Sequence, residues 1–115
     1  MRKIAVFMAV IIIISMPLTV SAATNALEID PYLTFSGTTA TCDVMVVGNN
    51  TSEHIQVTMK LMYGSTCVAS WSDSGYGYVY MLEYAGVTKG RTYELIVAVT
   101  VNDVAKTPVS VSGTC

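Results

Sequence analysis

Four tyrosines recur at short intervals and could do binding chemistry together. They are Tyr76, Tyr78, Tyr80 and Tyr84. Side chains alternate between the two faces of a strand, so a strand over residues 76–84 would place all four on one face. Each ring offers a flat apolar surface and a hydroxyl, and an exposed row could stack sugar rings or cover a peptide, with Trp71 as a candidate neighbour. Val79 and Met81 on the opposite face are also apolar, so either face of this strand could point into the core. Of these two orientations, we expect the one in which the tyrosines face the core.

Cysteine chemistry is the second possibility. The three cysteines are Cys42, Cys67 and Cys115, and they allow at most one intramolecular disulfide. The candidate disulfide joins Cys42 to Cys115, since closing a loop of about 70 residues could contribute on the order of 4 kcal/mol. Cys67 is the alternative partner. Two other states stay open: all three thiols reduced, with Cys42 a small buried residue, or a leftover thiol, best carried by Cys115, that bridges to another molecule.

Catalytic and metal-binding patterns are not evident in the sequence. His54 is the only histidine and has no cysteine or histidine partner at a metal-binding spacing. Serines are common, but none stands in a Gly-x-Ser-x-Gly turn, and the acidic residues are scattered. A hydrolase built from dispersed residues would require a buried polar cluster around His54. We therefore expect no enzyme, no cofactor and no metal.

Alternation of apolar and polar residues predicts the strands that position these side chains. The predicted strands cover residues 27–35, 40–47, 55–63, 67–72, 76–84, 92–101 and 106–112. Pro31 and Pro108 assign two of them to edges or bulges, because proline cannot donate to a ladder. Residues 73–75 and Asn102-Asp103 are predicted turns. About seven short antiparallel strands indicate an all-β fold, a β-sandwich.

One local motif refines this fold class. Residues 90–93, Gly-Arg-Thr-Tyr, resemble the entry to strand F of immunoglobulin-like and fibronectin type III domains. In those domains a tyrosine hydroxyl ties the corner to upstream backbone, which would make Tyr93 a structural corner residue. The chain departs from a true immunoglobulin domain, since Leu95 replaces the second core cysteine and Trp71 lies 29 residues after Cys42. The resemblance is thus to the immunoglobulin-like β-sandwich in general.

The N-terminal residues have the layout of a secretory signal peptide. Basic residues at 2–3 precede an apolar run at 4–14, and small residues at 20 and 22 favour a cut after Ala22, with Ala23 as the alternative. A retained membrane anchor is the competing interpretation. The run is shorter than the roughly 20 apolar residues of a spanning helix, so we expect membrane contact only if this leader is uncleaved.

These features divide the chain into a signal-peptide helix, residues 1–22, and a single β-sandwich domain, residues 23–115. Without the leader, four basic residues face eight acidic ones, a net charge of −4. That balance excludes nucleic acid as an expected partner, because phosphate backbones demand clustered Lys and Arg. We expect a secreted, extracellular protein.

The mature region also resembles a group of small, uncharacterised secreted proteins of Gram-positive, Clostridia-like bacteria. The matching features are Pro31-Tyr32, Thr41-Cys42, Gly48, the alternating run 55–61, Val68-x-x-Trp71-Ser72 and Gly90-x-x-Tyr93. The resemblance implies a sandwich domain of unknown function and no established activity. The expected function is a non-enzymatic binding or structural module for an unknown extracellular protein or glycan. The alternative is a carbohydrate-binding protein that uses Tyr76, Tyr78 and Tyr80.

Overall fold

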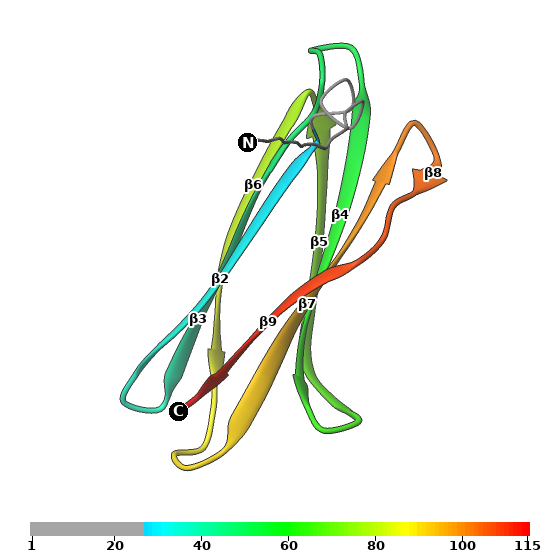
Figure 1. Ribbon diagram of the computed structural model, residues 1–115. Helices are drawn as coiled ribbons and strands as arrows, with labels where there is room; N and C mark the ends of the chain where they lie inside the picture. The colour runs from blue at the N-terminus through cyan, green and yellow to red at the C-terminus, as the bar shows by residue number, and fades with distance from the viewer. Residues whose placement is uncertain (1–26) are drawn as a thin grey trace, which may run out of the picture.

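The computed structural model describes residues 27–115, which form two antiparallel β-sheets packed face to face (Figure 1). The all-β prediction is confirmed for this range, in which no residue is helical. The same range contains no apolar helix long enough to cross a membrane. The predicted leader, residues 1–22, lies outside the described residues.

The two sheets contain three and five strands. The first sheet has the order β2-β3-β6 and consists of β2 (Glu28–Ser36), β3 (Thr39–Val47) and β6 (Tyr78–Gly86). The second contains β4 (His54–Tyr63), β5 (Thr66–Tyr76), β7 (Thr92–Val101), β8 (Val104–Ala105) and β9 (Val109–Thr114). In that sheet β4 lies between β5 and β7, while β8 and β9 both pair with β7. Figure 1 shows the first sheet on the left and the second on the right.

The core lies between the sheets and is built from alternate residues of four strands. Its buried side chains are Ala40, Cys42, Val44, Val46, Ile55, Val57, Met59, Leu61, Val79, Met81, Tyr93, Leu95, Val97, Val99 and Val101. In β3, β4 and β7 the buried side chains are the apolar residues that alternate along the sequence, at positions 40–46, 55–61 and 93–101. Tyr63 ends β4 beyond a register shift after Leu61 and is 40% exposed.

Two turn predictions had different outcomes. Asn102 and Asp103 both have positive φ, 49° and 67°, and join β7 to β8 in the tight hairpin that these residue types favour. The turn predicted at residues 73–75 is wrong, because β5 continues through them to Tyr76. The chain leaves β5 at Gly77, whose φ is 75°.

The two prolines of the described range occupy positions where a ladder does not need their missing N–H. Pro31 lies in β2, which forms an edge of the first sheet and pairs with β3 alone. Pro108 comes just before β9 begins. The predicted edge or bulge placement is confirmed for Pro31, and Pro108 stands outside the strand altogether.

Candidate binding face

The predicted tyrosine row is divided between the two sheets. Tyr76 ends β5, where it is opposite His54 of β4, and the two rings pack at a tilt of 32° with centroids 5.0 Å apart. Tyr78 begins β6 in the other sheet, followed by Tyr80 and Tyr84 at alternate positions. The prediction of one strand carrying all four tyrosines is therefore wrong, because the crossover at Gly77 separates the first from the others.

The tyrosines of β6 point away from the core. Tyr78 is 51% exposed and Tyr80 is 48% exposed, whereas Val79 and Met81 between them are each 3% exposed. The core-facing orientation expected from the sequence is thus wrong. The two apolar side chains fill the space between the sheets, and strand alternation then sends the tyrosines outward.

A further tyrosine from a distant part of the chain joins them on the outer face of the first sheet. Tyr32 of β2 is 61% exposed and lies opposite Asp43 of β3, which in turn lies opposite Leu82 of β6. We call this surface the tyrosine face: the outward side of β2, β3 and β6. Its exposed apolar side chains are Tyr32, Tyr78, Tyr80, Leu82 and Tyr84.

Carboxylates are interspersed with the rings on the tyrosine face. Glu28 and Asp30 alternate with Tyr32 along β2, and Asp43 occupies the central strand. Asp43 lies between Tyr32 and Leu82 and is partly buried, and the resulting desolvation raises the pKa of its carboxyl. The face is therefore acidic as well as aromatic.

The outer face of the second sheet has a different character. Across β4 and β5 it carries small hydroxyl side chains, such as Ser70, Ser72 and Thr58, and the last two share a hydrogen bond of 3.0 Å between their hydroxyl oxygens. Lys60 of β4 is exposed on the same side. The two outer faces of the sandwich thus differ in both apolar content and charge.

Trp71 does not lie beside the tyrosine row. It occupies an inward position of β5, opposite Met59, and is partly buried against the core. Tyr78 and Tyr80 occupy the outward side of the other sheet. The sequence interpretation that placed Trp71 next to the row fails because β5 and β6 belong to different sheets.

The three cysteines are separate free thiols in the structure. Cys42 is fully buried and faces Leu33 of β2, while Cys67 is exposed on β5. The Cys115 thiol donates a 3.3 Å hydrogen bond to the Gly37 carbonyl oxygen. Cys42 is thus next to Leu33, and Cys115 is next to Gly37, four residues further along the chain. Four extended residues span about 13 Å, whereas the Cα atoms of bridged cysteines are usually within about 7 Å. The candidate Cys42–Cys115 disulfide is consequently not formed in this arrangement.

Tyr93 lies at the second position of β7 with its ring buried. Its hydroxyl accepts a 2.9 Å hydrogen bond from the Thr88 backbone N–H, five residues upstream. The ring also packs against Phe35 and Tyr63, with centroids 6.0 Å and 5.6 Å away. This contact ties the loop before β7 to the strand itself.

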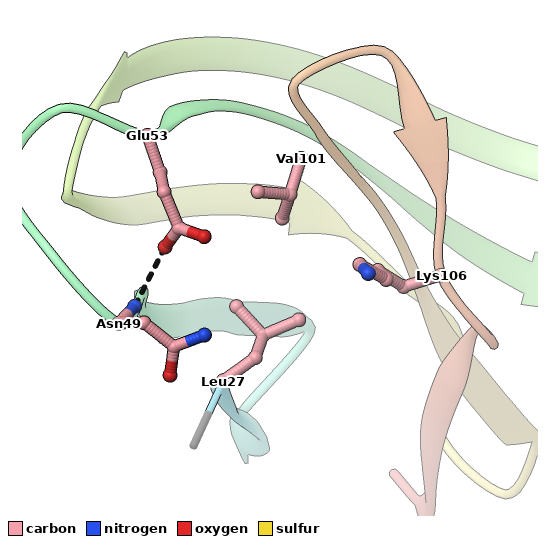
Figure 2. Close-up of a pocket in the computed structure, with 5 residues that line it drawn as sticks. All are labelled: Leu27, Asn49, Glu53, Val101 and Lys106. Atoms are coloured by element: carbon pink, nitrogen blue, oxygen red, sulfur yellow. Dashed lines mark hydrogen bonds between the residues drawn. The ribbon is translucent and has the colours of Figure 1, made fainter. Parts of the chain in front are cut away.

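A shallow pocket of about 310 Å³ lies at one end of the sandwich (Figure 2). It is lined by Leu27, Asn49, Glu53, Val101 and Lys106. The Glu53 carboxylate accepts a 2.6 Å hydrogen bond from the Asn49 backbone N–H, so it already closes the loop between β3 and β4. Figure 2 shows this bond beside the pocket. Glu53 therefore has a structural use that competes with a ligand.

Among residues 27–115 no group of three or more His, Cys, Asp and Glu side chains is placed to hold a metal ion. Comparison with protein-family models and with curated proteins found no match to this chain. Within the described range, the tyrosine face is the surface on which exposed apolar side chains gather most densely.

Sequence reasoning missed part of this face. Tyr84 and Leu82 share the β6 alternation, and the outward direction of Asp43 follows from β3. Tyr32 and Asp30 come from a strand 40 or more residues earlier than β6 and reach the face only through the pairing of β2 with β3. The available signal was the alternation within β2, which places Glu28, Asp30 and Tyr32 on one side of the strand.

Proposed function

We propose that this chain is a secreted, non-enzymatic binding module that contacts an extracellular protein or glycan through its tyrosine face. One observation carries the proposal. Of nine large hydrophobic side chains exposed in residues 27–115, five lie on this face: Tyr32, Tyr78, Tyr80, Leu82 and Tyr84. Soluble proteins seldom leave large apolar side chains contiguous on one surface unless that surface binds something.

The fold that we infer for this module is an immunoglobulin-like β-sandwich. Support comes from the division of strands, with β2, β3 and β6 in one sheet and β5, β4, β7 and β9 in the other. The hydrogen bond from Thr88 N–H to the Tyr93 hydroxyl also matches the tyrosine corner of such domains. In this arrangement a sheet face is available for contacts without disturbing the core.

The extracellular location rests on the leader pattern at residues 1–22, with release after Ala22. A module of this kind acts by contact, and the proposal contains no catalytic step. Tyrosine suits such a role, because its ring supplies rigid contact area and its hydroxyl supplies a hydrogen bond.

Carbohydrate binding is the second candidate function. It is favoured by the exposure of Tyr78 and Tyr80, whose rings are adjacent on the same side of β6 and could stack sugar rings. Tyr76 belongs to the other sheet, so this candidate now uses Tyr78, Tyr80 and Tyr84.

The test is to apply the secreted protein to arrays of glycans and of peptides, together with two matched variants. Tyr80→Ala removes a ring from the tyrosine face. Tyr76→Ala removes an even more exposed ring, 68% accessible, from the second sheet. We expect the first variant to lose the array signal by about tenfold or more, as for an interface hot spot, and the second to retain it.

Signals that fall equally in both variants would contradict the proposal, as would the absence of any signal that depends on Tyr80. Circular dichroism spectra of the parent and both variants would establish that the fold is unchanged. Whether the Tyr80-dependent signals are glycans or peptides then separates the two candidate functions.

A further inference from the structure

The distribution of charge on the tyrosine face indicates the chemistry of the partner that would bind there. Glu28, Asp30 and Asp43 all lie on the face, at alternate positions of β2 and β3. The four basic residues of the described range lie elsewhere: Lys60 on β4, Lys89 and Arg91 between β6 and β7, and Lys106 after β8. Three carboxylates thus share a surface that holds no cation of its own.

Asp43 occupies the centre of this arrangement. Its neighbours across the ladder are Tyr32 on β2 and Leu82 on β6, while Tyr80 and Tyr84 lie diagonally on either side of Leu82. A carboxylate among apolar neighbours loses part of its hydration without gaining an opposite charge. A cation delivered by a partner would restore that charge balance.

We infer that the partner is a basic polypeptide segment that lies across the tyrosine face and inserts arginine or lysine side chains between the rings and the carboxylates. This inference rests on the proposed binding function of the face. Arginine fits both components, because its guanidinium forms charge-assisted hydrogen bonds to carboxylates and stacks over tyrosine rings. The same chain already makes the second contact internally, with the Arg91 guanidinium carbon 4.4 Å from the Tyr63 ring centroid.

The size of the face favours a segment over a second copy of the chain. Three strands of nine residues, at about 4.8 Å between strands and 3.3 Å per residue, span roughly 400 Å². Standard protein–protein complexes bury about 800 Å² of accessible surface on each partner, and obligate homodimers bury more. Symmetric pairing of two tyrosine faces would also bring their carboxylates together with no basic residue between them, which opposes self-association.

The test compares three ligands by calorimetry on the secreted protein: a short peptide of alternating arginine and glycine, its glutamate counterpart, and a neutral gluco-oligosaccharide. The face variant is Asp30→Asn/Asp43→Asn, which removes two charges and keeps every tyrosine. The control variant, Asp73→Asn/Glu94→Gln, removes the same net charge from the second sheet. Tyr80→Ala is the third variant.

We expect the parent to bind the arginine peptide and not the glutamate peptide. The face variant should bind the arginine peptide about three- to tenfold more weakly, as expected for two lost ion pairs, and the control variant should change by less than about twofold. Added salt should weaken binding by the parent more than binding by the face variant. Tyr80→Ala should weaken binding as well.

Three results would overturn the inference: no binding of the arginine peptide, equal weakening in the face and control variants, or tight binding of the glutamate peptide. Tyr80-dependent binding of the neutral oligosaccharide that is insensitive to Asp30→Asn/Asp43→Asn would overturn the inference and leave the proposed function standing. If no ligand depends on Tyr80, both fail.

Discussion

At the scale of single residues, Cys42 shows how the core protects a reactive group. Burial of the thiol, reinforced by the nearby carboxylates of Asp43 and Glu83, raises the pKa of Cys42 to about 11. Glu83 is opposite Cys42 across the ladder, at an inward position of the edge strand β6. The thiol therefore stays protonated in the folded protein at neutral pH. Glu83 has a second effect, because an inward-pointing charge on an edge strand discourages pairing with another chain.

This pKa predicts a pH dependence of stability. In the unfolded chain the cysteine thiol ionises with a pKa near 9.0, whereas the folded thiol keeps its proton up to about pH 11. Between these values the folded state binds more protons, so the free energy of unfolding falls as pH rises, by about 2 kcal/mol across the window. Urea unfolding at stepped pH should show this fall, with the contribution fully present below pH 9.

The control is Cys42→Ala, which removes the thiol and leaves every other titratable group in place. The difference in unfolding free energy between parent and variant should shrink as pH rises from 9 to 11. A thiol reagent should meanwhile label exposed Cys67 and spare Cys42 until urea unfolds the chain. Parallel stability curves for parent and variant would contradict the account.

At the scale of elements, Gly77 determines where the chain passes from one sheet to the other. Its φ of 75° lies in the left-handed region, and an added Cβ would come within 2.8 Å of the Thr51 Cα. Its N–H donates to the Glu53 carbonyl oxygen at 2.8 Å, and its own carbonyl accepts from the Gly48 N–H at 2.9 Å. The crossover is thus held against the loop between β3 and β4.

Gly77→Ala should lower the free energy of unfolding by about 1–3 kcal/mol, because the strained φ and the steric contact add. Gly86→Ala is the matched control. Gly86 lies at the opposite end of β6 from Gly77, where an added Cβ would have open space, and its φ is not positive. Urea unfolding of both variants would measure the difference, and equal stabilities would show that the crossover tolerates a side chain.

Much of the strand layout was predictable from sequence, because alternation is strong where one face is buried. The alternating runs that contain Ile55 and Tyr93 predicted strands at 55–63 and 92–101, which agree with β4 and β7 within one residue. The prediction failed at Gly75, whose residue type suggested a turn. An added Cβ at Gly75 would lie 2.8 Å from the Tyr78 carbonyl oxygen, so the glycine is required for a close approach of β5 to β6. Sequence alone does not distinguish these two uses of glycine.

At the scale of the whole molecule, the outer faces of the two sheets carry different kinds of side chain. The tyrosine face combines rings with carboxylates, and the face across β4 and β5 carries hydroxyl groups and Lys60. Alternation predicts the direction of each side chain, but the assignment of strands to sheets depends on long-range pairing. For this reason the sequence indicated Tyr78 and Tyr80 as candidates, and could not bring Tyr32 and Asp43 to them.

The most direct test of the central claim is an NMR titration of the isotope-labelled protein with the arginine–glycine peptide. We predict that the amide shifts that change will cluster on β2, β3 and β6, with the largest changes around Asp43 and Tyr80. The amides of β5, β4, β7 and β9 should change little. Shift changes centred on that second sheet, or spread evenly over both sheets, would contradict the assignment of the tyrosine face as the binding surface.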